Sequence, residues 1–178
     1  MSIRVMLDTN AVVALVKARS PALEDYVRGR VACISVVTEA EVLYGLARRP
    51  VGVALRRVIE GLLATVEILP WDSACAAAYG SLRAQLETLG KPLAPMDLLI
   101  AAHALATRCP LVTADRAFTQ VSGLSVIEWS AGGVTVLTER PAGRARTKRT
   151  WKRVTPRDVH EAVVHAQTPV RKAKSKAR

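Results

Sequence analysis

The amino-acid sequence predicts an α/β protein whose core is a parallel sheet covered by helices. Short apolar runs alternate with helical patterns up to residue 129, and half of the 178 residues are hydrophobic. The first apolar run ends in Asp8, directly before a helical pattern. Parallel strands need long crossover connections, which helices usually supply, so this alternation favours a parallel sheet. The length suffices for one domain with a buried core and an appendage.

Two strand–helix units open the chain. Their predicted strands are 3–7 and 31–35, and their predicted helices are 11–16, about 21–29, and 36 to 46 or 47. The strands are apolar and contain β-branched residues, which favour extended backbone. Ser35 is suited to cap the helix that follows it. Pro50 stops that helix, because the residue before a proline avoids helical backbone.

Three further strands and four helices complete the alternation. The predicted strands are 66–69, 111–115 and 124–128, and the predicted helices are 51–64, 73–89, 95–107 and 116–121. The first of these helices is amphipathic, because Leu55, Ile59 and Leu62 recur at helical spacing. Gly90 and Pro92 end the long helix that precedes them. Further along, the pattern at 134–138 is compatible with one edge strand.

The net charge of the chain is confined to its end. Residues 140–178 hold 13 of the 26 Lys and Arg residues but only Asp158 and Glu161 among the acids, so they carry the whole formal net charge of +11. We therefore expect a folded domain at residues 1–131 and a basic, partly disordered C-terminal extension at 132–178. Within that extension we expect a short helix at 156–167. The extension either binds a polyanion through phosphate contacts or is a solvated end.

The cysteines and the hydropathy pattern exclude several classes of protein. Cys33, Cys75 and Cys109 are widely spaced, and the sequence around them is largely apolar. We interpret them as reduced core residues of a cytoplasmic protein. No uninterrupted apolar segment reaches 18 residues, and Asp8 and Asn10 interrupt the only early apolar run, so we expect neither a membrane span nor a signal peptide. Neither a phosphate-binding loop nor a nucleophile elbow occurs, so ATPase and acyl-transfer functions lack support.

Four acidic residues stand where a single site can gather them. Asp8 and Asp115 follow the first and fourth predicted strands and emerge side by side if these strands are neighbours. Glu41 and Asp97 lie on helices that can overhang the same edge. Carboxylates packed this closely repel one another unless a cation such as Mg²⁺ or Mn²⁺ neutralises them, and such an ion suits phosphodiester hydrolysis. Taken singly, each acid has an ordinary alternative role as a helix cap, turn residue or surface residue.

Four short motifs resemble those of the PIN-domain ribonucleases, specifically the VapC toxins of type II toxin–antitoxin (VapBC) modules. They are Asp8-Thr9-Asn10, residues 34–45 around Glu41, residues 97–104 beginning with Asp97-Leu98-Leu99, and residues 113–118 beginning with Thr113-Ala114-Asp115. The resemblance implies a three-layer α/β/α sandwich with five parallel strands. It also implies Mg²⁺-dependent endonucleolytic cleavage of RNA, leaving a 3′-hydroxyl and a 5′-phosphate.

The resemblance also assigns roles to individual residues. It implies that Asp8, Glu41, Asp97 and Asp115 form the catalytic site, with Asp8 and Asp97 as metal ligands. The residues that orient these carboxylates would be Thr9, Asn10, Ser35 and Thr113. Ala114 departs from the family pattern, which often has Asn before the last Asp, so hydrogen bonding around Asp115 is in doubt. The implied partners are an RNA substrate, a cognate antitoxin and a second copy of the chain.

Two other functions compete with this interpretation. A phospho-accepting receiver domain also carries acids at parallel-strand ends, but the acidic pair and the lysine that it needs have no obvious counterpart. A non-catalytic nucleic-acid-binding protein would act through the basic extension, where Trp151 offers one stacking side chain among Lys and Arg residues. His103 follows Asp97 by six residues, about 240° round a helix, so we expect a packed or surface histidine rather than a catalytic one.

Overall fold

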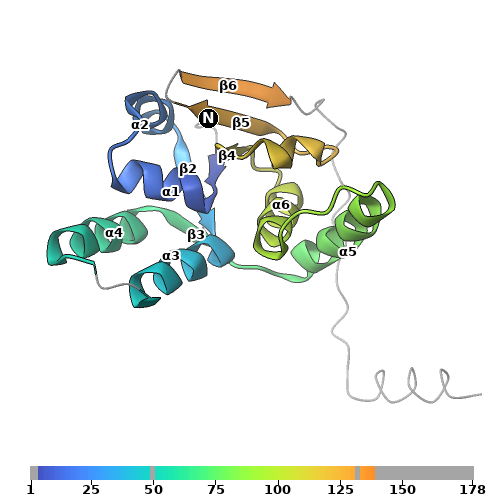
Figure 1. Cartoon of the computed structure of the whole chain (residues 1–178), viewed down its shortest axis with the longest axis horizontal. Helices are drawn as coiled ribbons and strands as arrows, with labels where there is room; N and C mark the ends of the chain where they lie inside the picture. Colours follow the sequence, from blue (N-terminus) through green and yellow to red (C-terminus); the bar gives the residue numbers. More distant parts are fainter. Residues whose placement is uncertain (1–3, 49–50, 131–132, 139–178) are drawn as a thin grey trace, which may run out of the picture. The chain divides into compact units, whose positions relative to one another are not determined.

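The computed structural model describes residues 4–48, 51–130 and 133–138, all of which belong to one compact unit, Met1–Ala142 (Figure 1). A second unit comprises Gly143–Arg178. The basic extension, including the predicted helix at 156–167 and Trp151, lies outside the described residues except for 133–138. The fold is therefore that of the unit that carries the four acids.

A mixed sheet of six strands forms the centre of the described unit. In chain order these are β1 (Arg4–Leu7), β2 (Val31–Ser35), β3 (Glu67–Leu69), β4 (Leu111–Thr113), β5 (Val126–Ser130) and β6 (Gly133–Thr138). They are arranged in the order β3-β2-β1-β4-β5-β6, with the first five parallel and β6 antiparallel to β5. The five predicted parallel strands are confirmed, and the compatible pattern at 134–138 forms a sixth. The sheet thus continues beyond residue 131.

Helices cover both faces of this sheet. They are α1 (Thr9–Val16), α2 (Pro21–Arg28), α3 (Val36–Arg48), α4 (Val53–Thr65), α5 (Ser73–Thr88) and α6 (Pro95–Thr107), with a short 3-10 helix, η1, at Arg116–Gln120. Figure 1 shows α1 to α4 on one side of the strands and α5 and α6 on the other. The three-layer α/β/α architecture expected from the sequence is therefore confirmed.

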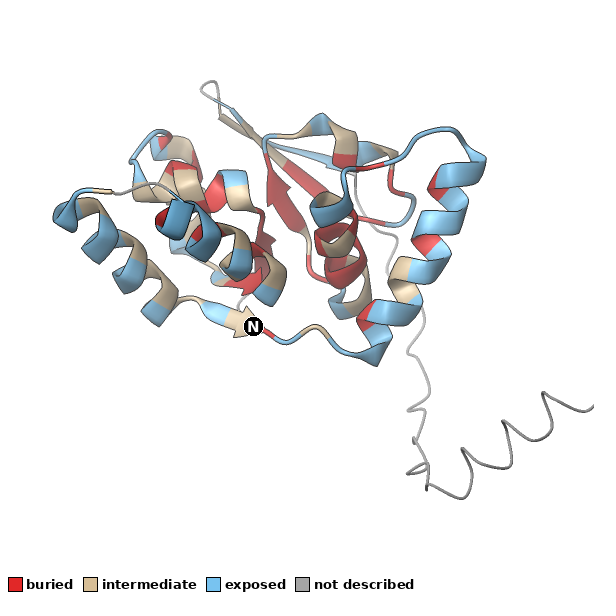
Figure 2. Ribbon diagram, turned by 60° about the horizontal axis from the view of Figure 1, so that its bottom comes forward, coloured by how far each residue is buried: buried red, intermediate tan, exposed pale blue. Residues whose placement is uncertain are grey.

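Alternate residues of each strand supply the two cores. Val5 and Leu7 face one layer with α1 and α2, whereas Met6 between them faces α5 and α6. This alternation follows from the pleat, which points successive side chains to opposite faces. Figure 2 shows the buried residues concentrated on the central strands and on α6. The residues that end these strands are consequently held at fixed positions along one edge.

Helix α4 differs from the other helices because none of its residues is buried. Its apolar side chains, including Ile59, Leu62 and Leu63, pack only partly against the core on the α1 side. Figure 2 shows the same helix without any buried position. Helix α4 therefore leaves part of its apolar face uncovered, next to α1 and α3.

The described part of the chain also bears on the predictions made for the cysteines and for membrane-spanning helices. Cys33, Cys75 and Cys109 are free and buried, as expected for reduced core residues. Among the helices that the structure describes, none combines the length and apolar character needed to cross a bilayer.

Candidate active site

The strand order brings the first and fourth strand ends together. Leu7 of β1 is paired with Val112 of β4, and the Asp8 backbone N–H donates a hydrogen bond of 3.2 Å to the Val112 carbonyl oxygen. Asp8 follows β1 directly, and Asp115 follows β4 after one residue. Because the chain leaves β1 toward β2 on one side and meets β4 on the other, this is the switch point where open α/β sheets bind ligands.

Asp8 is both a helix cap and the most buried acid of the group. Its Oδ1 accepts a hydrogen bond of 2.7 Å from the Ala11 N–H, and its Oδ2 accepts one of 2.5 Å from the Thr113 hydroxyl. Only 3% of its surface is exposed. Burial raises the pKa of Asp8 to about 6, and the charges of Asp97 and Asp115 add to this, although the two hydrogen bonds oppose it. Asp8 therefore does cap helix α1, but its ionised carboxylate is a buried charge that capping alone does not neutralise.

Asp97 lies in the first turn of α6 without capping it. The N-cap is Ala94, which has no capping side chain, and Pro95 begins the helix. Within the described part of the chain, no group donates a hydrogen bond to the Asp97 carboxylate. Burial raises the pKa of Asp97, as do the charges of Asp115 and Glu41. Its carboxylate is therefore half-buried, close to other acids and available to a ligand.

Glu41 and Asp115 complete the group from two other elements. Glu41, on α3, accepts a hydrogen bond from the Thr9 hydroxyl at the start of α1. Asp115 caps η1, and its Oδ1 accepts a hydrogen bond of 2.8 Å from the Ala117 N–H. The four acids thus come from four separate segments of the chain and influence one another electrostatically.

The residues expected to orient the carboxylates behave in different ways. Thr113 donates to Asp8, and its oxygen accepts a hydrogen bond of 2.9 Å from the Asp115 N–H, so one hydroxyl ties two acids together. Thr9 holds Glu41. Ser35 instead contacts an imidazole, and Asn10 is exposed and lines a cavity beside Asp115.

His103 is buried, so of the two expected alternatives, a packed or a surface histidine, the packed one is confirmed. Its partner was not foreseen. Its Nδ1 lies 2.8 Å from the Ser35 hydroxyl oxygen, which also accepts a hydrogen bond of 3.0 Å from the Val37 N–H. The Ser35 hydroxyl thus contacts both the imidazole ring and the first turn of α3. Burial lowers the pKa of His103, with opposition from the charge of Asp72, which favours the neutral form of the ring. The contact links α6 to the end of β2.

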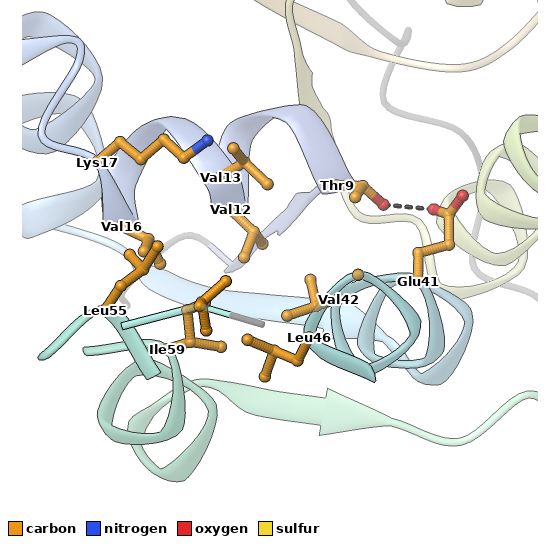
Figure 3. Close-up of a pocket in the computed structure, with 12 residues that line it drawn as sticks. Thr9, Val12, Val13, Val16, Lys17, Glu41, Val42, Leu46, Leu55 and Ile59 are labelled. Carbon is orange, nitrogen blue, oxygen red and sulfur yellow. Dashed lines mark hydrogen bonds between the residues drawn. The ribbon is translucent and has the colours of Figure 1, made fainter. Parts of the chain in front are cut away.

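Helix α1 separates two hollows, one on each side of the acidic site. The apolar groove, of about 330 Å³, runs between α1, α3 and α4; its lining includes Thr9, Lys17, Glu41, Leu46, Leu55 and Ile59. Figure 3 shows Thr9 and Glu41 at one end of this groove and Lys17 at the other. The polar cavity, of about 430 Å³, is lined by Asn10, Val13, Ala14, Arg19, Ala114, Asp115 and Trp129. Both hollows therefore begin at residues of the acidic site.

The donor set fits a hard divalent cation. Every candidate ligand is a carboxylate, and oxygen ligands are those that Mg²⁺ and Mn²⁺ prefer. A cation would neutralise the buried Asp8 and relieve its repulsion with Asp97 and Asp115. In the described ranges, no three acidic, His or Cys side chains form a closed metal cluster.

The comparisons with known proteins agree with this fold. Residues 5–124 match the family described as PIN domain. The chain is 33% identical over 132 residues to the tRNA(fMet)-specific endonuclease VapC of Shigella flexneri, covering 72% of this chain and 99% of that protein. It is 34% identical over 133 residues to ribonuclease VapC2 of Haemophilus influenzae, covering 71% of this chain and 98% of that protein.

Solved structures show the same likeness. A chain in the crystal structure of VapBC2 from Rickettsia felis, bound to a promoter DNA fragment, aligns with a TM-score of 0.67 at 27% identity, covering 72% of this chain and 100% of that one. DNA-bound VapBC from Salmonella typhimurium gives a TM-score of 0.63 at 30% identity, covering 73% and 100%. A largely parallel sheet of this topology, together with this sequence match, defines a PIN-domain nuclease. The chain belongs to the PIN-domain family and, within it, to the VapC group.

Proposed function

We propose that the protein is a Mg²⁺-dependent endoribonuclease, the toxin of a type II toxin–antitoxin module, acting in the cytoplasm. The observation that carries this proposal is the buried Asp8 carboxylate, whose raised pKa reflects both its burial and the acids around it. Such an arrangement makes sense when a cation occupies the centre of the group. A divalent metal ion belongs to the chemistry of the family, and the choice of Mg²⁺, with Mn²⁺ as an alternative, is part of the proposal.

The residues of the chain have distinct parts in this mechanism. Asp8 and Asp97 would hold the ion: Asp8 is fixed by Ala11 and Thr113, and Asp97 is free of hydrogen bonds in the described part of the chain. When bound, the ion lowers the pKa of a water molecule and offsets charge that develops on the phosphate. Glu41 and Asp115 add negative charge on either side of that centre, and their hydrogen bonds keep them in place to orient the attacking water.

The test is cleavage of RNA by purified wild-type and variant proteins. Wild type should cleave a mixed RNA substrate with Mg²⁺ and stop when EDTA is added, and the products should carry 5′-phosphates. Asp8→Asn should be inactive, because an amide is a poor ligand for a hard cation. Glu39→Gln is the matched control, since Glu39 lies on the same helix as Glu41 but does not contribute to the raised pKa of Asp8 or Asp97. Cleavage by Asp8→Asn at the wild-type rate would contradict the proposal.

We also infer that a cognate antitoxin occupies the apolar groove. The groove is lined mainly by Val, Leu and Ile side chains, and it ends beside Glu41, so a helix lying in it would reach the acids (Figure 3). The similar solved structures described above are named VapBC complexes. Co-expression with the product of the neighbouring small gene, followed by sizing of the complex, tests the partner and the expected homodimer together. Absence of a stable complex would count against both.

The competing functions receive less support from the described residues. A receiver domain would be phosphorylated on a strand-end acid, whereas Asp8 is buried and already accepts two hydrogen bonds. Nucleic-acid binding through the basic extension alone would leave the acidic site without a purpose. Removal of residues 140–178 separates the two ideas, because a nuclease that acts through its acidic site keeps cleaving RNA after the truncation.

A further inference from the structure

We propose that the polar cavity beside α1 is a nucleotide subsite, in which Arg19 contacts an RNA phosphate and Trp129 stacks on a base. The inference rests on the proposed ribonuclease function and names where the RNA strand lies as it leaves the acidic site. Asn10, which is exposed and lines the same cavity, offers an amide to the sugar or base. The cavity volume of about 430 Å³ lies in the range of sites that bind small ligands.

The two hollows on either side of α1 differ in a way that separates their ligands. Both begin at the acidic site, and each is lined by one cation that follows α1: Lys17 in the apolar groove and Arg19 in the polar cavity. Apart from Lys17, the apolar groove is lined mostly by aliphatic side chains, which suit a protein helix better than a charged strand. The polar cavity combines a guanidinium, an amide and an indole. RNA therefore fits the polar cavity.

Two backbone hydrogen bonds at the end of α1 fix the position of Arg19. The Arg19 N–H donates a hydrogen bond of 3.0 Å to the Ala14 carbonyl, and the Ala18 N–H donates one of 3.1 Å to the Leu15 carbonyl. These two bonds form a Schellman motif, in which the residue in the left-handed conformation is usually glycine. Here it is Ala18, with a φ of 48°. A residue with a side chain costs about 1 kcal/mol in this conformation, and such strain is often found near functional sites.

The Arg19 side chain is available to a ligand. It is exposed and forms no ion pair within the described ranges, although Asp115 lines the same cavity. A phosphate placed near Asp115 would be repelled unless a cation accompanied it. Arginine is well suited to this task, because its planar group can make two hydrogen bonds to one phosphate. Arg19 is thus the group that makes this side of the acidic site acceptable to a polyanion.

Trp129 contributes a flat apolar surface to the same cavity. Its ring is half-buried at the end of β5, and its Nε1–H is buried without a hydrogen-bond partner among the described residues. A buried indole usually finds a partner for its N–H, so hydrogen bonding does not explain a tryptophan at this position. Stacking on a nucleobase uses the face of the ring instead, and is tolerant of sequence because every base has one.

Steady-state cleavage of a short RNA tests the phosphate contact. Arg19→Gln should raise KM about tenfold, the effect of losing one charge-assisted hydrogen bond, and leave kcat within about twofold. The slope of log KM against log salt should fall by about 0.7, as expected for one phosphate contact to a single strand. Lys17→Gln is the matched control: it removes a cation two residues away, on the apolar side, and should change neither quantity. Equal effects of the two substitutions would overturn the inference.

Binding without cleavage separates this inference from the proposed function. In a Trp71→Phe/Trp151→Phe protein, Trp129 is the remaining tryptophan. A short RNA oligonucleotide added in EDTA should quench its fluorescence, and Arg19→Gln should weaken that binding about tenfold. Quenching by RNA in a protein that never cleaves would support the subsite and refute the nuclease function. Cleavage by a protein whose Trp129 fluorescence does not respond to saturating RNA would refute the subsite alone.

Discussion

Removal of the Asp8 charge should stabilise the metal-free protein while abolishing its activity. Asp8 has a pKa of about 6 in the folded chain against 3.8 for an ordinary carboxyl, and it is 3% exposed. Ionising it at pH 7.5 therefore costs the folded state about 3 kcal/mol. Asp8→Asn removes this cost and keeps the cap to Ala11, but disturbs the hydrogen bond from Thr113, which is worth about 1 kcal/mol. The expected net gain is about 2 kcal/mol.

The sign of the pH dependence follows from the raised pKa. The folded state binds the Asp8 proton more tightly than the unfolded state, so this contribution to stability is fully present below pH 3.8 and is lost as the pH rises through about 6. Metal-free wild type should consequently lose stability between these values. The unfavourable contribution at pH 5 is about half of that at pH 7.5, so the advantage of Asp8→Asn should shrink as the solution is acidified.

Urea unfolding in EDTA at pH 5 and pH 7.5 measures this difference. Asp72→Asn is the control, because Asp72 caps α5 on the surface and its backbone and side-chain hydrogen bonds with Cys75 lower its pKa, so removing its charge should not stabilise the protein at pH 7.5. If Asp8→Asn is less stable than wild type at both pH values, or gains equally at both, the buried charge is not the source of instability and the reasoning fails.

Three further predictions concern the same region. Mg²⁺ should stabilise wild type more at pH 7.5 than at pH 5, because it competes with a proton for Asp8, and should stabilise Asp8→Asn little; thermal unfolding with and without Mg²⁺ measures this, and an equal shift in both proteins would argue against binding at Asp8. Thr113→Val should lower kcat at least tenfold and cost about 1–3 kcal/mol in urea unfolding, since one buried hydroxyl serves both Asp8 and the Asp115 N–H; wild-type kcat would exclude a positioning role. Leu55→Asp should weaken antitoxin binding by placing a charge in the apolar groove, yet leave RNA cleavage by the free protein unchanged; calorimetry and a cleavage assay distinguish the two effects, and unaltered antitoxin affinity would show that the groove is not the docking surface.

Local sequence patterns were sufficient to predict most helices and strands, and to predict on or next to which of them each of the four acids lies. Strand and helix signals come from residues close together in sequence, so the alternation and most boundaries agree with the structure to within two or three residues. Asp97 shows the limit of such reasoning. A first-turn acid is usually explained as part of a helix start, and only the three-dimensional arrangement places its carboxylate near Glu41 and Asp115.

Contacts between distant segments had to come from the tertiary structure. Ser35 and His103 are 68 residues apart, and Thr113 and Asp8 are 105 residues apart. Hydrophobic periodicity in the sequence cannot predict such hydrogen-bonded pairs. A hydroxyl is compatible with many partners until the fold brings one of them within reach. The same is true of the pKa of Asp8, which depends on how much water the surrounding layers exclude.

The sequence by itself determined that this is an α/β protein with acids at its strand ends, and that its positive charge lies in the final 39 residues, 140–178, rather than in the fold. Only the tertiary structure decided that α1 divides an apolar groove from a polar cavity at that acidic edge. The physical reason is that hydrophobic periodicity records which residues avoid water. Which hollow a remaining polar residue such as Arg19 or Trp129 faces depends on how the layers pack and on the turn at Ala18.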